Sequence, residues 1–157
     1  MLMLLFYINN ERYALPSQQV LEVIPLVSFT KLPHTPEYMV GVFNYRDSIV
    51  PVMDLSQFIA GKPCCEHLST RIILVKCVHN QPSSGLEQQE QYILGLMAER
   101  VVETLHVSEA GLVDVNLQIG KVPYVGKMIL DEQGIIQYLP IDYLLSEAEK
   151  LDFLPAG

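Results

Sequence analysis

The sequence has no tryptophan, few charged residues and few cations among those charges. Only 18% of its 157 residues are charged, and 10 Lys and Arg face 18 Asp and Glu, giving a formal net charge of −8. Nucleic-acid binding depends on Lys and Arg that neutralise phosphates, so this balance argues against a nucleic-acid partner. Half of the residues are hydrophobic, a content that intrinsic disorder does not show.

Cysteines and long apolar runs are also scarce. The three cysteines are Cys64, Cys65 and Cys77, and an odd count with two neighbours is a poor disulfide framework, which favours a reducing compartment. The apolar N-terminal run lacks basic residues and gives way to Asn9 after eight residues, far short of the roughly 20 that cross a bilayer. We therefore expect a cytoplasmic protein without direct membrane insertion.

Short apolar segments with alternating pattern, separated by turn residues, make up most of the chain. They predict strands over residues 2–8, 12–15, 23–27, 41–46, 49–55, 71–78, 92–97, 101–107, 124–130 and 134–139. No strand–helix–strand alternation is present, so a doubly wound sheet is excluded. The pattern is typical of a mainly β fold, a small barrel or a pair of barrels.

The connections between these strands carry more specific expectations. Residues 17–22 predict a short helical turn, and Pro51 inside its strand predicts an edge or a bulge, since proline cannot donate to a ladder. The polar, Gln-rich stretch 79–91 predicts a hairpin loop, and the weakly patterned stretch 108–121 a second loop. A C-terminal helix is expected to begin at Pro140.

Groups that could support chemistry are present but poorly arranged. A zinc site needs about four spaced ligands, and neighbouring cysteines are poor chelates, so no metal is expected from Cys64, Cys65, Glu66, His67, Cys77 and His79. No sequence feature pairs the carboxylates Asp47, Asp54, Glu99 and Glu103 for acid–base work. Gly-rich phosphate loops and nucleophile elbows are missing too, so no catalytic residue and no cofactor is predicted.

Several short strings of the sequence form a recognisable order of motifs. These strings are Glu11-Arg12-Tyr13-Ala14-Leu15-Pro16, Val20-Leu21-Glu22-Val23-Ile24, Leu32-Pro33-His34-Thr35-Pro36, Gly41-Val42-Phe43-Asn44-Tyr45-Arg46, Ile49-Val50-Pro51-Val52-Met53-Asp54-Leu55 and Arg71-Ile72-Ile73-Leu74-Val75. In their order and spacing, and over residues 2 to about 148, the chain resembles the CheW-like domain of bacterial chemotaxis adaptors.

The resemblance implies a fold and a role. The fold would be one domain over residues 1–157, in which two small five-stranded SH3-like barrels share a core, with short helices and a C-terminal helix. The role would be that of a stand-alone, non-catalytic adaptor. Such adaptors join the cytoplasmic tips of chemoreceptors to the related regulatory domain of a CheA-type histidine kinase, at membrane receptor arrays.

Four residues match family positions tied to partner binding. Arg46 stands where the family's Asn-Leu-Arg-Gly turn has its arginine, and Gly41 opens the strand that leads to it. Val20 and Glu22 match a short helical segment that contributes to the partner surface. Asp54 matches an acidic position after the Val-Pro-Val strand, where we expect a structural cap rather than a contact.

The chain departs from the family at two places. The turn reads Asn44-Tyr45-Arg46-Asp47, so Asp47 replaces a glycine that reaches positive φ easily, and it brings a carboxylate next to Arg46. Ala98-Glu99 stands where Val-Asp is usual. A pilus-motility or phototaxis system fits such an adaptor equally well.

Two alternatives to an adaptor remain. One is a small β-barrel enzyme or ligand-binding domain that uses the cleft between the lobes, and the other is a structural subunit of a larger complex.

Overall fold

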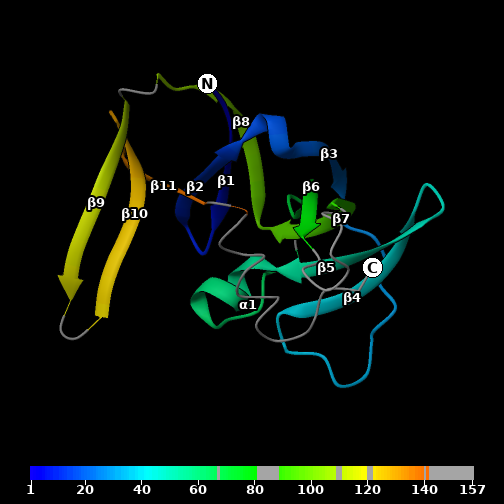
Figure 1. The fold of residues 1–157 in the computed structure, drawn as a ribbon. Coiled ribbons are helices and arrows are strands. Elements are labelled where there is room, and N and C mark those ends of the chain that lie inside the picture. Colours follow the sequence, from blue (N-terminus) through cyan, green and yellow to red (C-terminus); the bar gives the residue numbers. More distant parts are fainter. Residues whose placement is uncertain (67, 81–88, 109–110, 120–121, 140, 142–157) are drawn as a thin grey trace.

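The computed structural model describes residues 1–66, 68–80, 89–108, 111–119, 122–139 and 141 (Figure 1). Strands dominate it, as the alternating apolar pattern predicts. The elements are β1 (Leu2–Ile8), β2 (Glu11–Pro16), the 3-10 turn η1 (Ser17–Gln19), β3 (Val20–Pro25), β4 (Met39–Tyr45), β5 (Ser48–Asp54), α1 (Leu55–Ala60), β6 (Arg71–Asn80), β7 (Gln89–Ala98), β8 (Arg100–His106), β9 (Leu112–Ile119), β10 (Val122–Asp131) and β11 (Gly134–Tyr138).

One sheet joins the two ends of the described chain. Its strand order is β8-β1-β2-β11-β10-β9, so it has six strands rather than the five that were expected. Its hairpins turn at Asn9-Asn10, where both residues have positive φ, and after Asp131, as the sequence predicts. β11 pairs with β2 in parallel over only two residue pairs. Figure 1 shows β9 and β10 running side by side away from the rest of the fold.

The second sheet has the order β3-β6-β7-β5-β4, and its two edge strands approach each other. The segment after β3 reaches β4 through a bridge between Thr30 and Val42, whose main chains exchange hydrogen bonds of 2.8 and 2.9 Å. Ile24 from β3 and Phe43 from β4 pack against the same buried cluster. This sheet is therefore strongly curled around its own interior.

Alternating side chains give the sheets buried faces on both sides. In β6, Ile73 and Val75 point into a large cluster shared with Phe6 of the six-stranded sheet, while Ile72 and Leu74 point into a separate cluster. In β1, Met3 likewise belongs to a cluster on its sheet's other face. The fold is thus two β lobes with one core between them, as predicted for a mainly β, two-lobed protein.

Several local predictions were wrong. The helical turn expected over residues 17–22 ends at Gln19, and Val20 already belongs to β3. The expected loop 108–121 contains β9, and the expected loop 79–91 is shortened because β6 and β7 pair as far as Asn80 and Gln89. The helix α1 was not predicted. These errors arise where polar side chains hide the strand period or where a helix is only six residues long.

Two further predictions concern a C-terminal helix and membrane insertion. The C-terminal helix expected from Pro140 lies outside the described residues, apart from Ile141. None of the helices in the described ranges is long and apolar enough to cross a membrane. The assignment of residues 1–157 to a single domain stays a prediction.

Candidate functional site

Arg46 lies at the tip of the turn that joins β4 to β5. The side chain is 77% exposed, and the register of Tyr45 opposite Ser48 leaves Arg46 and Asp47 as a two-residue loop. Both loop residues have positive φ, 47° and 67°, as in tight hairpin turns. The Asp47 N–H donates to Asn44 Oδ1 over 3.0 Å. Aspartate therefore occupies the glycine position of the related turn, as expected from its tolerance of this geometry.

A polar cluster holds Arg46 to the opposite edge of the sheet. Glu22 Oε2 lies 3.7 Å from Arg46 Nη2 and accepts a hydrogen bond from the Tyr45 hydroxyl. The guanidinium carbon also lies 5.2 Å from the centre of the Tyr45 ring. We call Glu22, Tyr45 and Arg46 the Arg46 cluster. Because Glu22 lies on β3 and Tyr45 on β4, the cluster links the two edge strands.

The electrostatics of the cluster keep the tyrosine protonated. The hydrogen bond to Glu22 raises the pKa of the Tyr45 hydroxyl, and partial burial acts in the same direction. The hydroxyl therefore remains a donor at neutral pH. Within the described part of the chain, the ion-pair partner of Arg46 is Glu22 rather than its neighbour Asp47, the carboxylate expected from the sequence.

Val20 and Glu22 lie on opposite faces of β3. The register shifts between them, so that Val20 lies opposite Val75, while Glu22 lies opposite Leu74. Val75 belongs to the core between the lobes, and Val20 packs against that core. The two residues are thus on a strand, not on the helical segment expected, and the structure brings only Glu22 to Arg46.

Gly41 is buried in β4 and shapes the site indirectly. Its φ is 145°, and a Cβ atom there would lie 2.5 Å from the carbonyl oxygen of Thr30. The missing side chain lets the Thr30 segment bridge to Val42 on β4. A glycine is therefore required for the curled sheet that carries the Arg46 turn.

The carboxylate of Asp54 is used by the fold. Its Oδ1 accepts hydrogen bonds from the N–H groups of Ser56 and Gln57 at the start of α1, and its Oδ2 accepts one from Cys64 N–H at 2.8 Å. Burial raises the pKa of Asp54, with the three hydrogen bonds opposing this effect. The prediction of a structural cap is confirmed, because Asp54 precedes α1 and its carboxylate accepts from the first main-chain N–H groups of that helix.

The cysteines do not converge in the structure. Cys64 packs with Val52 and Met97, whereas Cys77 belongs to the core between the lobes, on the other face of the sheet. Burial, with the nearby Asp54 charge, raises the pKa of the Cys64 thiol to about 12, so it stays protonated. His67 and the side chains of His79 and Glu103 lie outside the described residues.

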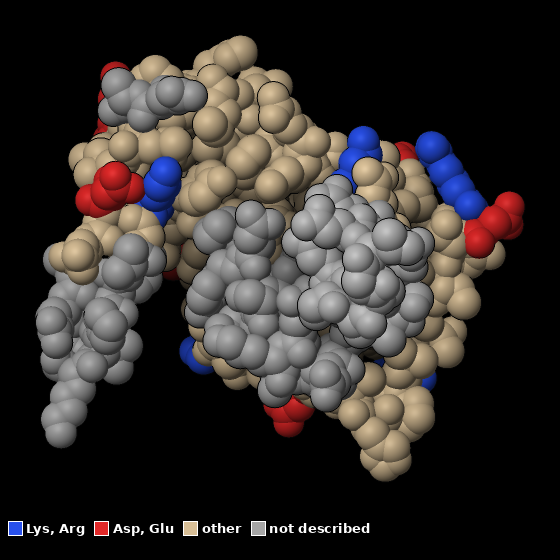
Figure 2. All heavy atoms as spheres, in the orientation of Figure 1, with Lys and Arg blue, Asp and Glu red and all other residues tan. Residues whose placement is uncertain are grey.

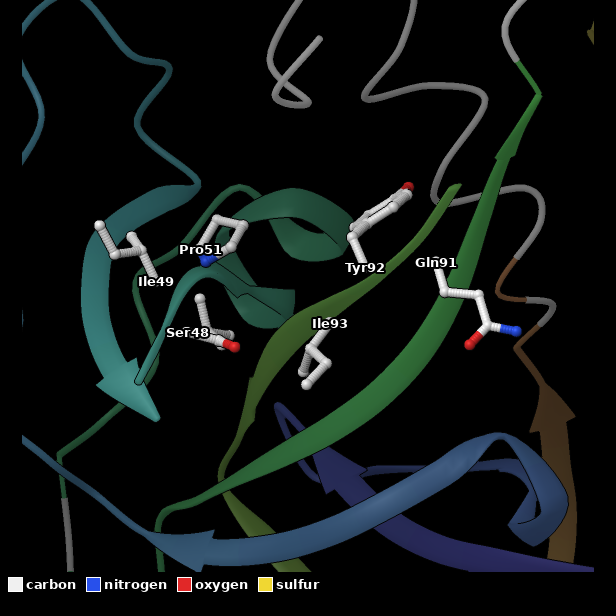
Figure 3. Close-up of a pocket in the computed structure, with 7 residues that line it drawn as sticks. Ser48, Ile49, Pro51, Gln91, Tyr92 and Ile93 are labelled. Atoms are coloured by element: carbon white, nitrogen blue, oxygen red, sulfur yellow. The ribbon is translucent and has the colours of Figure 1, made fainter. Parts of the chain in front are cut away.

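A small pocket of about 240 Å³ opens where β5 and β7 diverge (Figure 3). The N–H and C=O groups of Val42 bond to Thr30, on the side of β4 that faces away from β5. Val42 and its partner Pro51 therefore form a non-hydrogen-bonded pair, and the main-chain N and C=O of Pro51 face β7 instead of β4. Proline has no N–H to donate there, and the β5–β7 pairing begins only at Val52. Pro51 thus lies on an interior strand rather than at the expected edge or bulge.

The composition of this pocket bears on the enzyme alternative. It lies within one sheet rather than between the lobes, and its lining residues are Ser48, Ile49, Val50, Pro51, Gln91, Tyr92 and Ile93. This lining supplies no carboxylate or imidazole. Converging carboxylates or histidines are the groups that would favour the enzyme alternative, and this lining does not supply them.

Exposed apolar side chains lie close in sequence to the charged residues of the Arg46 cluster. Figure 2 shows Lys, Arg, Asp and Glu in small groups over the described part of one face, with other residues between them. Leu21 and Ile49, next to the cluster in sequence, are exposed hydrophobics. Arginine beside exposed apolar groups is a common composition for protein interfaces. Sequence reasoning missed Tyr45 as part of this site; the signal was an aromatic residue directly before the turn arginine.

Comparisons with known proteins agree with this geometry. The family model for the CheW-like domain matches residues 2–149. Chemotaxis protein CheW of Helicobacter pylori is 28% identical over 107 residues, which cover 68% of this chain and 58% of that protein. A probable chemotaxis protein CheW of Rhizobium etli is 26% identical over 144 residues, covering 92% and 86% of the two chains.

A solved structure supports the same assignment. The scaffolding protein TtCheW from Thermoanaerobacter tengcongensis superposes with a TM-score of 0.71 at 25% identity, covering 89% of this chain and 84% of that one. The match extends over both β lobes, since it spans most of each chain. The chain therefore belongs to the CheW-like domain family and has the two-lobed β fold of a CheW scaffolding protein.

Proposed function

We propose that the protein is a non-catalytic signalling adaptor that couples chemoreceptor-type proteins to a CheA-type histidine kinase in chemotaxis or a related motility system. Membership of the CheW-like family supports this role. The observation that carries it is the exposed Arg46, presented on a two-residue turn and held over Tyr45. An exposed arginine at the tip of a tight turn is suited to contacts with another protein.

The mechanism would rest on surface complementarity rather than chemistry. Arg46 and Glu22 would contact a partner directly, and exposed apolar residues such as Leu21 would bury area against it. Val20, at the edge of the core between the lobes, would contribute to a groove for an amphipathic receptor helix. Gly41 would act through the shape of the sheet, because it is buried.

Signalling would follow from the bridge that the adaptor forms. A receptor and a kinase bound to one rigid body influence each other through a coupling free energy, typically about 1–3 kcal/mol. The kinase's own CheW-like regulatory domain would dock on the strand edges of the lobes. The adaptor would thus work in the cytoplasm at membrane receptor arrays, and it would need no cofactor.

Reconstitution tests this function. The protein is mixed with the signalling domain of a chemoreceptor and the CheA-type kinase from the same organism, and kinase autophosphorylation is measured. We expect stimulation that requires all three components. Folded adaptor that binds neither component, and leaves the kinase rate unchanged, would contradict the proposal.

A further inference from the structure

One oxygen of Glu22 has two contacts in the Arg46 cluster. Oε2 accepts the Tyr45 hydroxyl proton in a hydrogen bond and lies 3.7 Å from the Arg46 guanidinium. The ion pair is long and exposed, with Arg46 77% and Glu22 41% accessible. Exposed ion pairs of this kind contribute little to stability, so the guanidinium is readily given up to another carboxylate.

Unlike the exposed side chains of the ion pair, the Tyr45 side chain is held in place by packing. Its ring packs against the cluster around Leu74 and lies edge-on to Phe43, with 6.4 Å between ring centres. Its hydroxyl donates directly to Glu22, in a hydrogen bond that does not involve Arg46. Glu22 then keeps a hydrogen-bond donor when Arg46 leaves, and the face of the Tyr45 ring remains beside the guanidinium.

We propose that Tyr45 is a positioning residue that lets Arg46 pass from Glu22 to a carboxylate of a bound protein partner. The inference rests on the proposed adaptor function, since Arg46 must face a partner. Without the hydroxyl, Arg46 would be the remaining protein partner of Glu22 among the described residues, and Glu22 would compete for it with the partner's carboxylate. With it, the exchange leaves both carboxylates satisfied.

Tyr45→Phe isolates this role, because it removes the hydroxyl and keeps the ring that packs on Phe43 and beside Arg46. Binding to the receptor signalling domain and to the kinase regulatory domain is measured by calorimetry, at low and high salt. We expect three- to tenfold weaker binding at low salt, a smaller loss at high salt and an unchanged thermal midpoint. Tyr7→Phe is the matched control, since the Tyr7 ring lies 4.3 Å from the guanidinium of Arg100 in another part of the surface.

A double-mutant cycle separates positioning from a structural role. On an Arg46→Gln or a Glu22→Gln background, Tyr45→Phe should have no further effect on binding, because one of the two exchanging charges is gone. An equal loss on those backgrounds, or a lowered thermal midpoint, would overturn the inference. So would wild-type affinity in Tyr45→Phe when Arg46→Gln binds weakly. If wild-type protein binds neither partner, the adaptor function itself fails.

Discussion

The two sheets differ in the contacts that their edge strands make. In the five-stranded sheet, the Thr30–Val42 bridge and the Glu22–Tyr45 hydrogen bond bring the edge strands β3 and β4 together. In the six-stranded sheet, β9 pairs only with β10 among the described strands, and this hairpin extends outward. Leu130, near the end of β10, is 64% exposed.

The two sheets therefore differ in how their outer elements are supported. Buried clusters cover both faces of the curled sheet that carries the Arg46 turn. The β9–β10 hairpin is attached through β11, which pairs with β2 over two residue pairs, and through a bidentate ion pair from Arg12 to Asp131 at 2.6 and 2.7 Å. Ile129 of β10 also packs in one buried cluster with Met3 and Leu5. Binding residues on a rigid support lose less entropy on docking, which favours the curled sheet as the docking lobe.

Gly41→Ala should break the closed sheet and has the largest expected effect. The new Cβ would lie 2.5 Å from Thr30 O, at a φ of 145° that alanine rarely adopts. We expect a loss of about 2–4 kcal/mol, in the range of backbone strain combined with steric overlap. Urea unfolding measures it.

Gly61→Ala is the control for this substitution. Gly61 also has positive φ, 72°, but no atom lies within 4 Å of its Cβ position. It should cost only about 1 kcal/mol, the penalty for φ alone. Equal losses at the two positions would contradict the role given to the Thr30 contact.

Arg12→Met should loosen the extended hairpin without opening the curled sheet. The Arg12 side chain is 9% exposed, and Asp131 33%, so removing the cation leaves a partly buried carboxylate without its ion-pair partner. Hydrogen exchange should accelerate in β10 and β11 and stay slow in β6. Uniform acceleration in both sheets would show that the hairpin is not independently attached.

The same pair makes a pH-dependent contribution. The hydrogen bonds from Arg12 lower the pKa of Asp131 to about 2, from an ordinary value of 3.8. A lowered folded-state pKa gives stability that is present above pH 4 and lost as the pH falls toward 2. Asp131→Asn should therefore flatten the stability profile between pH 4 and 2. A profile as steep as that of the wild type would exclude Asp131 as the titrating group.

Asp54→Ala tests the support beneath the curled sheet. The substitution removes the acceptor for the first N–H groups of α1 and for Cys64 N–H. Loss of such a cap typically costs about 1 kcal/mol, measured as a shift of the urea midpoint. Asp54→Asn keeps one acceptor oxygen and should recover part of the loss; no difference between the two variants would argue against capping.

Asp47→Gly should have the smallest effect of these substitutions, and it should stabilise the curled sheet rather than destabilise it. Asp47 has a φ of 67°, which glycine adopts without steric cost. We expect the turn to become more stable by about 0.5–1 kcal/mol, because relief of a left-handed strain of about 1–2 kcal/mol exceeds the entropic cost of a glycine, and this is seen as a raised thermal midpoint. A lowered midpoint would show that the Asp47 side chain has a stabilising contact of its own.

Much of this fold could be predicted from the sequence, because local chemistry decides it. The Asn9-Asn10 turn and the β10–β11 hairpin follow from residue preferences at short range. The turn position of Arg46 and the capping role of Asp54 were predicted from the family resemblance. The bulge at Leu21, which separates Val20 from Glu22, depends on how β3 meets β6, and no local pattern reports that. The contact of Tyr45 with Glu22 joins residues 23 apart, so it became visible only in three dimensions.

The central claim is that the Arg46 turn is the docking surface of an adaptor. The most direct measurement is co-sedimentation of the protein with receptor–kinase assemblies, comparing wild type with Arg46→Glu and with the matched charge reversal Lys127→Glu on β10, another exposed cation. The account predicts loss of binding for Arg46→Glu alone, with circular dichroism unchanged in both variants. Equal binding of Arg46→Glu and wild type would contradict it.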